Sequence, residues 1–429
     1  GVVTVTTGAG GSTTNRLELG AQSGARSNTI SVEGTGSLLQ LLQGTTLTVG
    51  HSNSYGGNSV TVANGGTINA TGAVTIAGYA LNGGNNDGYN RLVIANGGTF
   101  TTETTITNHG LVQLASGGVL NGTGSLGIEN GARFEVAGSG LAIQATVKAG
   151  GVLAVGQGSR RPPRFVELSW RPRGARTHVV LAGKGICFDT GGVSLKPLDG
   201  MRLMRKDMGA AAAVCATVLA AADLNLPVRV TALAPLAENL VSGSAMRPGD
   251  VIRHYGGTTT EVLDTDAEGR LVLGDALAYA TKRLRPDWLI DLATLTGASH
   301  VALGKQTAAL FSDCRELAEA LRNAGTEAGE PVWPLPLPDD YVRLLHSDVA
   351  DLANIARPAQ AGAVVAALYL RELVGDHRSR WAHIDMSAPA WSDRDNGPLV
   401  KGATGWGVRL LVAFLRAVAS GAVPPASEG

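Results

Sequence analysis

The chain has 429 residues, which is too long for one ordinary domain and indicates two or three. It carries 35 basic and 35 acidic residues, so its zero net charge gives no electrostatic reason to bind nucleic acid or an anionic membrane. Three cysteines without CxxC spacing exclude a disulfide framework, and no apolar run of about 18 residues predicts a membrane span. Cys187 and Cys215 lie in apolar stretches, so we expect both thiols to be buried. The chain begins with Gly and shows no signal peptide, so we expect a fragment or a mature form.

The composition changes sharply near residue 158. Residues 1–157 contain no proline, no tryptophan and a single lysine, Lys148, and are rich in Gly, Thr, Asn, Ser and Val. The later residues have the prolines, helix formers and mixed charge of an ordinary globular domain. Residues 158–163 form a linker by composition. We therefore predict a repeat region over 1–157, a linker and connecting segment over 158–176, and a second domain over 177–420.

A six-residue motif recurs in the first region. Val-Ala-Asn-Gly-Gly-Thr at 62–67 returns as Ile-Ala-Asn-Gly-Gly-Thr at 94–99 and as Leu-Ala-Ser-Gly-Gly-Val at 114–119, with weaker copies at 128–133 and 147–152. Asn-Gly and Gly-Gly supply the positive φ angles that tight turns need, and short alternating strands flank each copy. This pattern predicts a right-handed parallel β-solenoid, with another β-rich fold as the alternative.

The repeat region resembles the repeat segments of bacterial autotransporter passenger domains. The resemblance covers roughly residues 1–157 and rests on the repeats alone. It implies structural or adhesive work by an exported or cell-surface protein. Nothing in this region predicts catalysis, because its polar candidates are isolated in the sequence: His51, Asp87 and His109.

From residue 177 onward, strands alternate with helices. Apolar runs at 178–182, 228–234 and 288–293 predict buried strands, and 209–222 predicts a tightly packed buried helix. A second helix is predicted over 270–279, with one apolar face. This alternation indicates an α/β fold in which helices cover a mixed sheet in three layers.

The most informative stretch of the chain is Asp-Thr-Asp-Ala-Glu-Gly-Arg at 264–270. Together with two carboxylates at strand ends or helix starts, it offers four acidic groups: Asp189, Asp207, Asp266 and Glu268. Such groups would repel one another in a partly dry pocket, and two divalent cations about 3.5–4 Å apart would neutralise them as a hydrolytic centre. The alternatives are a solvated turn, a single Ca²⁺ site, and a helix cap at Asp207.

Two lysines and an arginine accompany these carboxylates. Lys184 lies in the glycine-rich segment 183–192, after a predicted strand, where α/β sheets bind ligands. A protonated ammonium cannot coordinate a metal, so the residues alone predict that Lys184 and Lys196 contact substrate or an oxyanion. Two neighbouring dications would favour the neutral, coordinating amine. Arg270 would hold an anion, because arginine does not deprotonate in proteins.

At these residues the chain resembles the leucyl aminopeptidase family, the M17 metallopeptidases. The resemblance covers about residues 160–415. Asp264 stands where the family usually has Asn, and Ala210 where it usually has Gly. The motifs that carry the resemblance occur in family order at 183–192, 196–197, 204–209, 238–239, 248–250, 265–271, 293–297, 383–385 and 402–407.

The resemblance implies a metal-dependent aminopeptidase that releases leucine-like, apolar N-terminal residues from peptides by a two-metal hydroxide mechanism. Two Mn²⁺ or Zn²⁺ ions are implied, since the ligands combine oxygen and nitrogen. One ion would be held by Lys184, Asp189, Asp207 and Glu268. The other would be held by Asp189, Asp266 and Glu268.

The resemblance also assigns the remaining site residues. Lys196 would stabilise the tetrahedral oxyanion. Arg270 would hold a bicarbonate ion that serves as general base. The pocket for the substrate side chain would be lined by Met204, Thr294 and Ala388.

The family further implies a cytoplasmic homo-oligomer, a hexamer, that acts on peptides without nucleic acid or a membrane span. The repeat region, however, replaces the family's usual N-terminal domain. The alternative is therefore an exported or cell-surface adhesin or scaffold, built on the solenoid, whose peptidase domain is inactive.

Overall fold

The structure is a computed structural model in which the chain divides into two compact units, Gly1–Thr146 and Val147–Gly429. His51, Asp87 and His109 lie outside the described residues. No helix in the described part of the chain combines the length and the hydropathy that crossing a bilayer requires. The structure describes residues 2–5, 16–19, 28–41, 46–49, 58–70, 74–76, 90–95, 99–102, 106–108, 111–114, 119–122, 126–128, 133–136, 141–146, 149–395 and 400–423.

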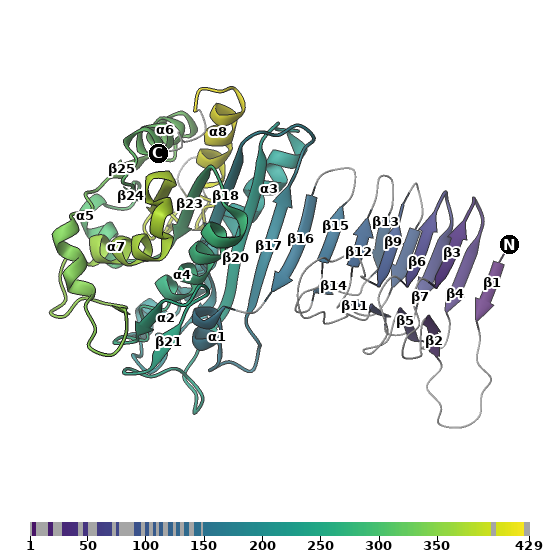
Figure 1. Ribbon diagram of the computed structural model, residues 1–429, viewed down its shortest axis with the longest axis horizontal. Coiled ribbons are helices and arrows are strands. Elements are labelled where there is room, and N and C mark those ends of the chain that lie inside the picture. Colours follow the sequence, from purple (N-terminus) through teal and green to yellow (C-terminus); the bar gives the residue numbers. More distant parts are fainter. Residues whose placement is uncertain are drawn as a thin grey trace. The chain divides into compact units, whose positions relative to one another are not determined.

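The N-terminal unit consists of short strands that pair in parallel with every third strand along the chain (Figure 1). The three resulting stacks run β1-β4-β7-β10-β13, β2-β5-β8-β11-β14 and β3-β6-β9-β12-β15. One further strand, β16, pairs with β15 in the antiparallel sense. The strands are β1 (Val2–Val5), β2 (Arg16–Leu19), β3 (Thr29–Glu33), β4 (Leu38–Leu41), β5 (Thr46–Val49), β6 (Ser59–Ala63), β7 (Thr67–Ala70), β8 (Val74–Ile76), β9 (Arg91–Ile94), β10 (Thr99–Thr102), β11 (Ile106–Asn108), β12 (Leu111–Leu114), β13 (Val119–Gly122), β14 (Leu126–Ile128), β15 (Arg133–Val136) and β16 (Leu141–Thr146).

Alternate side chains of these strands form the core of the unit. In β4 and β5, for example, buried and half-buried residues alternate along the strand. The turn of the first repeat copy is confirmed, since Asn64 and Gly65 have φ angles of 51° and 82° between β6 and β7. The turns of the copies at 94–99, 114–119 and 128–133 lie partly outside the described residues.

The prediction for the last copy, 147–152, is wrong. In place of a turn between strands, its second half starts helix α1 (Gly150–Gly156). A Cβ on Gly150 would lie 1.9 Å from the Arg253 carbonyl oxygen, and one on Gly151 would lie 2.4 Å from the Leu271 carbonyl oxygen. The two glycines that suggested a turn therefore allow a close helix contact.

The C-terminal unit contains a mixed sheet with the order β25-β24-β27-β23-β18-β20-β17, and β19 also pairs with β20. Its central neighbours β20, β18, β23 and β27 are parallel, whereas β17 and β24 pair in the antiparallel sense. A small sheet joins β21, β22 and β26, and β28 pairs with β29. The strands are β17 (Arg164–Trp170), β18 (His178–Gly183), β19 (Gly185–Asp189), β20 (Arg229–Asn239), β21 (Val251–Arg253), β22 (Thr259–Glu261), β23 (Trp288–Ala293), β24 (Ala308–Phe311), β25 (Val332–Pro334), β26 (Leu352–Ala353), β27 (Trp381–Asp385), β28 (Trp391–Ser392) and β29 (Gly402–Ala403).

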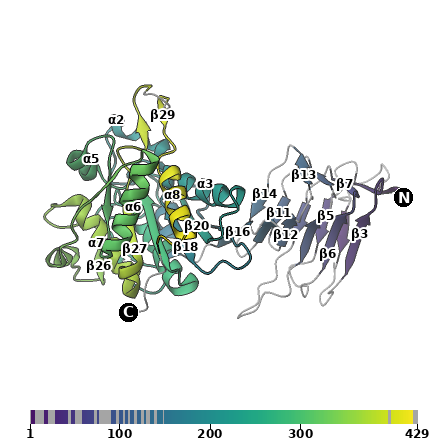
Figure 2. The ribbon, with the colours of Figure 1, turned by 90° about the horizontal axis from the view of Figure 1, so that it is seen from above.

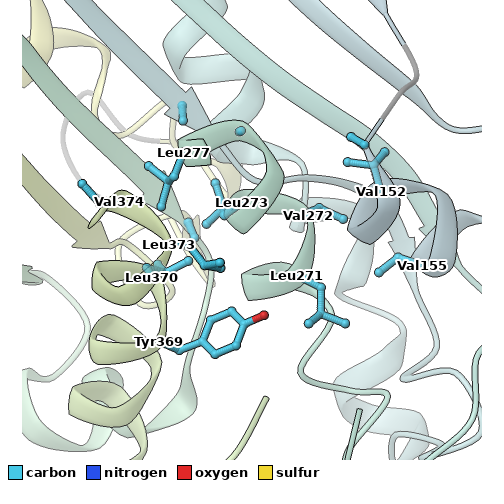
Figure 3. Packing of buried hydrophobic residues seen from close by; sticks show 14 of the residues in the cluster. Val152, Val155, Leu271, Val272, Leu273, Leu277, Tyr369, Leu370, Leu373 and Val374 are labelled. Atoms are coloured by element: carbon cyan, nitrogen blue, oxygen red, sulfur yellow. The ribbon is translucent and has the colours of Figure 1, made fainter. Parts of the chain in front are cut away.

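Two groups of helices flank this sheet, which confirms the predicted α/β fold with a mixed sheet. Figure 2 shows α6, α8 and α3 in a row, and Figure 3 shows α4 between α1 and α7. The remaining helices are α2 (Leu198–Met201), η1 (Met204–Lys206), α3 (Gly209–Asp223), α4 (Gly269–Tyr279), η2 (Ala280–Leu284), α5 (Gly297–Leu303), α6 (Arg315–Ala328), η3 (Asp339–Leu345), α7 (Gly362–Val374), η4 (Gly375–Arg380) and α8 (Val408–Ala419).

Two details differ from the sequence predictions. Helix α4 is buried on every side and not only along its predicted apolar face, because all its residues from Gly269 to Ala278 are buried, Arg270 and Asp275 included. Cys187 is exposed and Cys215 is half-buried, whereas both were predicted to be buried. The register of β19 against β20 shifts between Ile186 and Phe188, and Cys187 lies at this irregularity.

Candidate metal centre

The candidate site lies where the parallel strands of the C-terminal unit end. Lys184 follows β18, and Thr294 follows β23, its parallel neighbour. Asp189 and Asn239 are the last residues of β19 and β20 and face each other in register. Because parallel strands end at one edge of a sheet, these side chains meet although they are far apart in sequence.

Lys184 connects two of the predicted carboxylates. Its Nζ lies 2.8 Å from Asp207 Oδ2 and 2.8 Å from Glu268 Oε1, and it donates to the Thr294 carbonyl oxygen at 3.2 Å. Thr294 Oγ1 in turn donates to Asp207 Oδ1 at 2.5 Å. Burial opposes the charged amine, but Asp207 and Glu268 outweigh it and raise the pKa of Lys184.

Lys196 connects the other two carboxylates. Its Nζ lies 2.8 Å from Asp189 Oδ2 and 2.5 Å from Asp266 Oδ1. Burial again opposes the charged amine, but Asp189, Glu268 and Asp266 together raise the pKa of Lys196 above its usual value. Asp189 is fixed through its other oxygen, which accepts from Gly191 N and Asn239 Nδ2, both at 2.8 Å.

The four carboxylates remain short of compensating interactions. Asp207 Oδ2, Asp266 Oδ1 and Glu268 Oε1 each face one lysine ammonium, and among the described residues the buried Glu268 Oε2 has neither a hydrogen bond nor an ion pair. Burial raises the pKa of Glu268 to about 8, with Asp189 and Asp207 adding to the shift. It also raises the pKa of Asp266. Two lysines therefore do not fully replace what the carboxylates lose on burial.

Divalent cations fit this donor set. Asp189, Asp266 and Glu268 each offer an oxygen within 4.8 Å of the others. Glu268 belongs to the pair that Lys184 links, and its closeness to Asp189 and Asp266 connects this pair with the one that Lys196 links. Hard oxygen donors of this kind are those that Mn²⁺ and Zn²⁺ accept, together with nitrogen.

Two of the alternatives for the acidic groups, the helix cap and the solvated turn, are wrong. Asp207 is not the N-cap of α3, since that position is Met208 and the Asp207 oxygens face Lys184 and Thr294. The 264–270 turn is not solvated surface either, because Thr265 and Glu268 are buried and Asp266 is about one third exposed.

Arg270 lies beside this cluster on α4. Its NH1 donates to the Asn354 carbonyl oxygen at 2.6 Å, while its buried Nε has no hydrogen-bond partner among the described residues. Burial lowers the pKa of the guanidinium. A cavity of about 260 Å³ adjoins it, lined by Lys184, Asp264, Asp266, Ala267, Glu268, Gly269, Arg270, Leu295, Thr296, Gly297, Ala298, Ile355 and Gly362.

The three predicted pocket residues are placed less directly. Thr294 contacts the cluster through Asp207, as described above. Met204 is half-buried in η1, and Ala388 is buried. Their neighbours Lys206 and Ser387 are joined by a hydrogen bond of 3.3 Å. None of the three lines the 260 Å³ cavity.

Sequence reasoning did not assign roles to two polar residues that organise the site. Asn239 Nδ2 contacts both Asp189 and, at 3.0 Å, the Thr265 carbonyl oxygen. Thr265 Oγ1 donates to the Gly191 carbonyl oxygen at 2.6 Å. An Asn at the end of a buried strand, facing the site edge, was a usable signal for the first; the role of Thr265 depends on the folded turn.

Comparison with known proteins places these residues in a family. Residues 133–412, more than half of the chain, match the cytosol aminopeptidase family, catalytic domain. The chain belongs to the cytosol aminopeptidase family. It is 51% identical over 268 residues to the probable cytosol aminopeptidase of Chlorobaculum tepidum, covering 62% of this chain and 53% of that protein. The corresponding Chlorobium limicola protein is 49% identical over 293 residues, covering 67% and 57%.

Solved structures agree with this membership. The bottromycin maturation enzyme BotP in complex with Mn matches with a TM-score of 0.62 and 43% sequence identity, over 66% of this chain and 63% of that one. A second BotP structure matches with a TM-score of 0.59 and 45% identity, over 63% and 58%. The chain thus spans little more than half the length of the curated family members that it matches.

Proposed function

We propose that this chain is a metal-dependent aminopeptidase that releases leucine-like, apolar residues from the N-termini of peptides. The observation that carries the proposal is the buried group of four carboxylates that two lysines neutralise only in part, with Glu268 Oε2 left without a partner among the described residues. A buried acidic group of this kind requires a cation. Membership in the cytosol aminopeptidase family supports the reaction.

The proposed ligands of the two ions include all four carboxylates, and both ions share Asp189 and Glu268. Lys184, Asp189, Asp207 and Glu268 would hold one ion, and Asp189, Asp266 and Glu268 the other. Mn²⁺ is favoured over Zn²⁺ as the first ion to test, since a similar solved structure contains Mn. When bound, such ions supply Lewis-acid activation of the scissile carbonyl and of water.

The protein's own residues would bind the substrate and complete the charge pattern. Lys196, whose side chain is 16% exposed and pairs with Asp189 and Asp266, would donate to the oxyanion that develops on the scissile carbonyl. Arg270 is held at NH1 and would direct its remaining donors to bicarbonate, the proposed general base. Met204, Thr294 and Ala388 would line the pocket for the first side chain.

Hydrolysis of a leucyl chromogenic amide tests the proposal directly. The purified chain is loaded with Mn²⁺, and release of the chromophore is followed with and without chelator. We expect turnover that disappears with chelation and returns with metal. Folded chain that binds two equivalents of Mn²⁺ and releases no chromophore would contradict the aminopeptidase assignment.

We also infer that the N-terminal unit is a β-solenoid. The support is that strands three apart in the chain pair in parallel in all three stacks. The right-handed winding and the likeness to autotransporter passengers remain predictions, as do the boundaries at 157, 176 and 420. Limited proteolysis would test the boundaries, because cleavage within residues 158–176 would support them, whereas a stable fragment that begins near Val147 would contradict them.

Assembly and location complete the proposal. We infer a cytoplasmic location, since the similar curated proteins are named probable cytosol aminopeptidases, and a homo-oligomer, a hexamer, from the family resemblance. Light scattering gives the mass directly, and a monomer would contradict the hexamer. An exported chain with an inactive peptidase domain is the alternative, and metal binding by the purified chain would count against it.

A further inference from the structure

Asn354 is a fully buried residue that holds the metal-binding turn from outside. It follows β26, roughly 90 positions along the chain from the turn. Its Oδ1 accepts from Leu263 N at 2.7 Å and from Asp264 N at 3.2 Å, and its Nδ2 donates to the Asp264 carbonyl oxygen at 2.6 Å. One side chain thus fixes both the amide and the carbonyl of Asp264.

The backbone of Asn354 holds the other end of the same turn. Its carbonyl oxygen accepts from Arg270 NH1 at 2.6 Å, and its N–H donates to the Glu261 carbonyl oxygen at 3.0 Å. Parallel pairing of β26 with β22 brings the residue to this point. Asn354 therefore contacts the turn on both sides of the two carboxylates that it carries.

These bonds continue to a proposed metal ligand. Asp264 Oδ1 accepts from Asp266 N at 2.8 Å, so the position of Asp264 sets the backbone of Asp266. We propose that Asn354 is a positioning residue that orders Asp266 and Arg270 for metal and anion binding. The inference rests on the proposed metal centre and adds to it a residue that contacts neither metal nor substrate.

Only an amide side chain satisfies this arrangement. It accepts two N–H groups and donates to a carbonyl, whereas a carboxylate lacks the donor and an apolar residue lacks both. The pairing of β22 with β26 has a second side-chain contact besides Asn354. At the other end of β22, Thr259 N donates to Asp351 Oδ2 at 2.8 Å. Asp351 is exposed and offers a matched control.

The test compares Asn354→Ala and Asn354→Asp with the control Asp351→Ala in the full chain. Isothermal titration with Mn²⁺ gives the dissociation constants, and circular dichroism confirms folding. Loss of a residue that orients a ligand typically weakens metal binding or activity by about 10–100-fold. We expect that loss in Mn²⁺ affinity for both Asn354 variants and less than about a twofold change for the control.

Kinetics on the leucyl amide separate positioning from general loosening. We expect a lower kcat with little change in KM for the Asn354 variants, because Asp266 and Arg270 act on the reacting groups. Asn354→Asp keeps the shape and one acceptor, so it carries the test if Asn354→Ala does not fold. Wild-type Mn²⁺ affinity in either folded variant would overturn the proposal. If wild-type chain binds Mn²⁺ but does not cleave the amide, the aminopeptidase assignment fails while the affinities still decide the role of Asn354.

Discussion

Two buried polar clusters of the C-terminal unit, the His254 cluster and the candidate metal centre, differ in how far the protein satisfies their carboxylate oxygens. The His254 cluster comprises His254, Thr260, Asp275 and Tyr369. The Asp275 oxygens accept from Tyr255 N at 2.7 Å and Val152 N at 2.8 Å, and His254 Nδ1 lies 3.1 Å from Oδ1. His254 Nε2 lies 2.8 Å from Tyr369 Oη. The protein satisfies both oxygens of this carboxylate, whereas in the candidate metal centre Glu268 Oε2 has no partner among the described residues and Oε1 faces only Lys184.

This difference separates a structural cluster from a ligand site. Both are buried, and both combine a carboxylate with a potential cation. A cluster that satisfies its own oxygens stabilises the fold and has no capacity left for a ligand. One that leaves oxygens unpaired loses stability unless something else binds there. Mutations in the two clusters should therefore affect different measurements.

The largest effect is expected for Glu268→Gln. The change removes the charge of a proposed bridging ligand without changing its shape, so Mn²⁺ binding and turnover should be lost. Several kcal/mol of transition-state stabilisation depend on the metals, which corresponds to a rate loss on the order of 10³-fold. Isothermal titration and leucyl amide hydrolysis measure this, and unfolding by urea should show little loss of stability without metal. Retained Mn²⁺ binding would argue against Glu268 as a ligand.

Asp275→Ala should lower the unfolding free energy and leave Mn²⁺ binding unchanged, the reverse of Glu268→Gln. It leaves the N–H groups of Val152 and Tyr255 without an acceptor and His254 without its partner. Leaving a buried donor without its acceptor costs about 1–3 kcal/mol of unfolding free energy, and this change leaves at least two such donors. Urea unfolding of the metal-free chain measures the loss, with Asp351→Ala as an exposed control. Mn²⁺ affinity of the folded variant should stay unchanged, and a matched loss of affinity would remove the distinction between the two clusters.

The sequence predicts the metal centre better than the contacts that support it. Lys184, Asp189, Asp207 and the 264–270 turn follow from strand ends and an acidic motif, because a parallel sheet brings its carboxyl ends together. Asn354 and Asp275 could not be predicted in this way. Each lies in a segment without a motif, and its role depends on the pairing of β26 with β22 or on the contact of α1 with α4.

The same limit applies to the fold. The buried strands at 178–182 and 288–293 are long apolar runs, and both are confirmed. The helix at 150–156 could not be distinguished from a repeat turn, because Gly-Gly suits a turn and also a close helix contact. What decides between them is the surface of α4 against which Val152 and Val155 pack (Figure 3), and that surface exists only in the folded chain.

A buried histidine extends the comparison to pH. Burial, and then Arg229 and Arg171, lower the pKa of His178 to about 3, and its Nε2 lies 3.0 Å from Thr231 Oγ1. The folded state therefore favours the neutral ring. Its stabilisation is complete above the unfolded pKa of 6.5 and is lost as the pH falls towards 3.

Between pH 6.5 and pH 5 this loss amounts to about 2 kcal/mol. Urea unfolding of the metal-free chain at both pH values measures it, with chelator present. His178→Gln, which cannot be protonated in this range, should lose less stability over the same interval. An identical loss in the variant and the wild type would show that other groups account for the acid sensitivity.

The smallest effect is expected in the N-terminal unit, where the buried polar groups are neutral amides. Asn28 Nδ2 donates to Asn58 Oδ1 at 2.8 Å, and Asn58 Nδ2 donates to Asn90 Oδ1 at 2.9 Å, so one amide follows another across β3, β6 and β9. Neutral hydrogen bonds of this kind contribute about 1 kcal/mol each, and an unpaired buried partner costs about 1–3 kcal/mol. Asn58→Ala should therefore lower the unfolding free energy of this unit by about 1–3 kcal/mol while Mn²⁺ affinity stays constant. Thermal unfolding followed by circular dichroism measures the first and isothermal titration the second. A change in Mn²⁺ affinity would show that the row of Asn side chains contributes to the candidate metal centre. An unchanged Mn²⁺ affinity would show that these side chains serve the fold of their own unit.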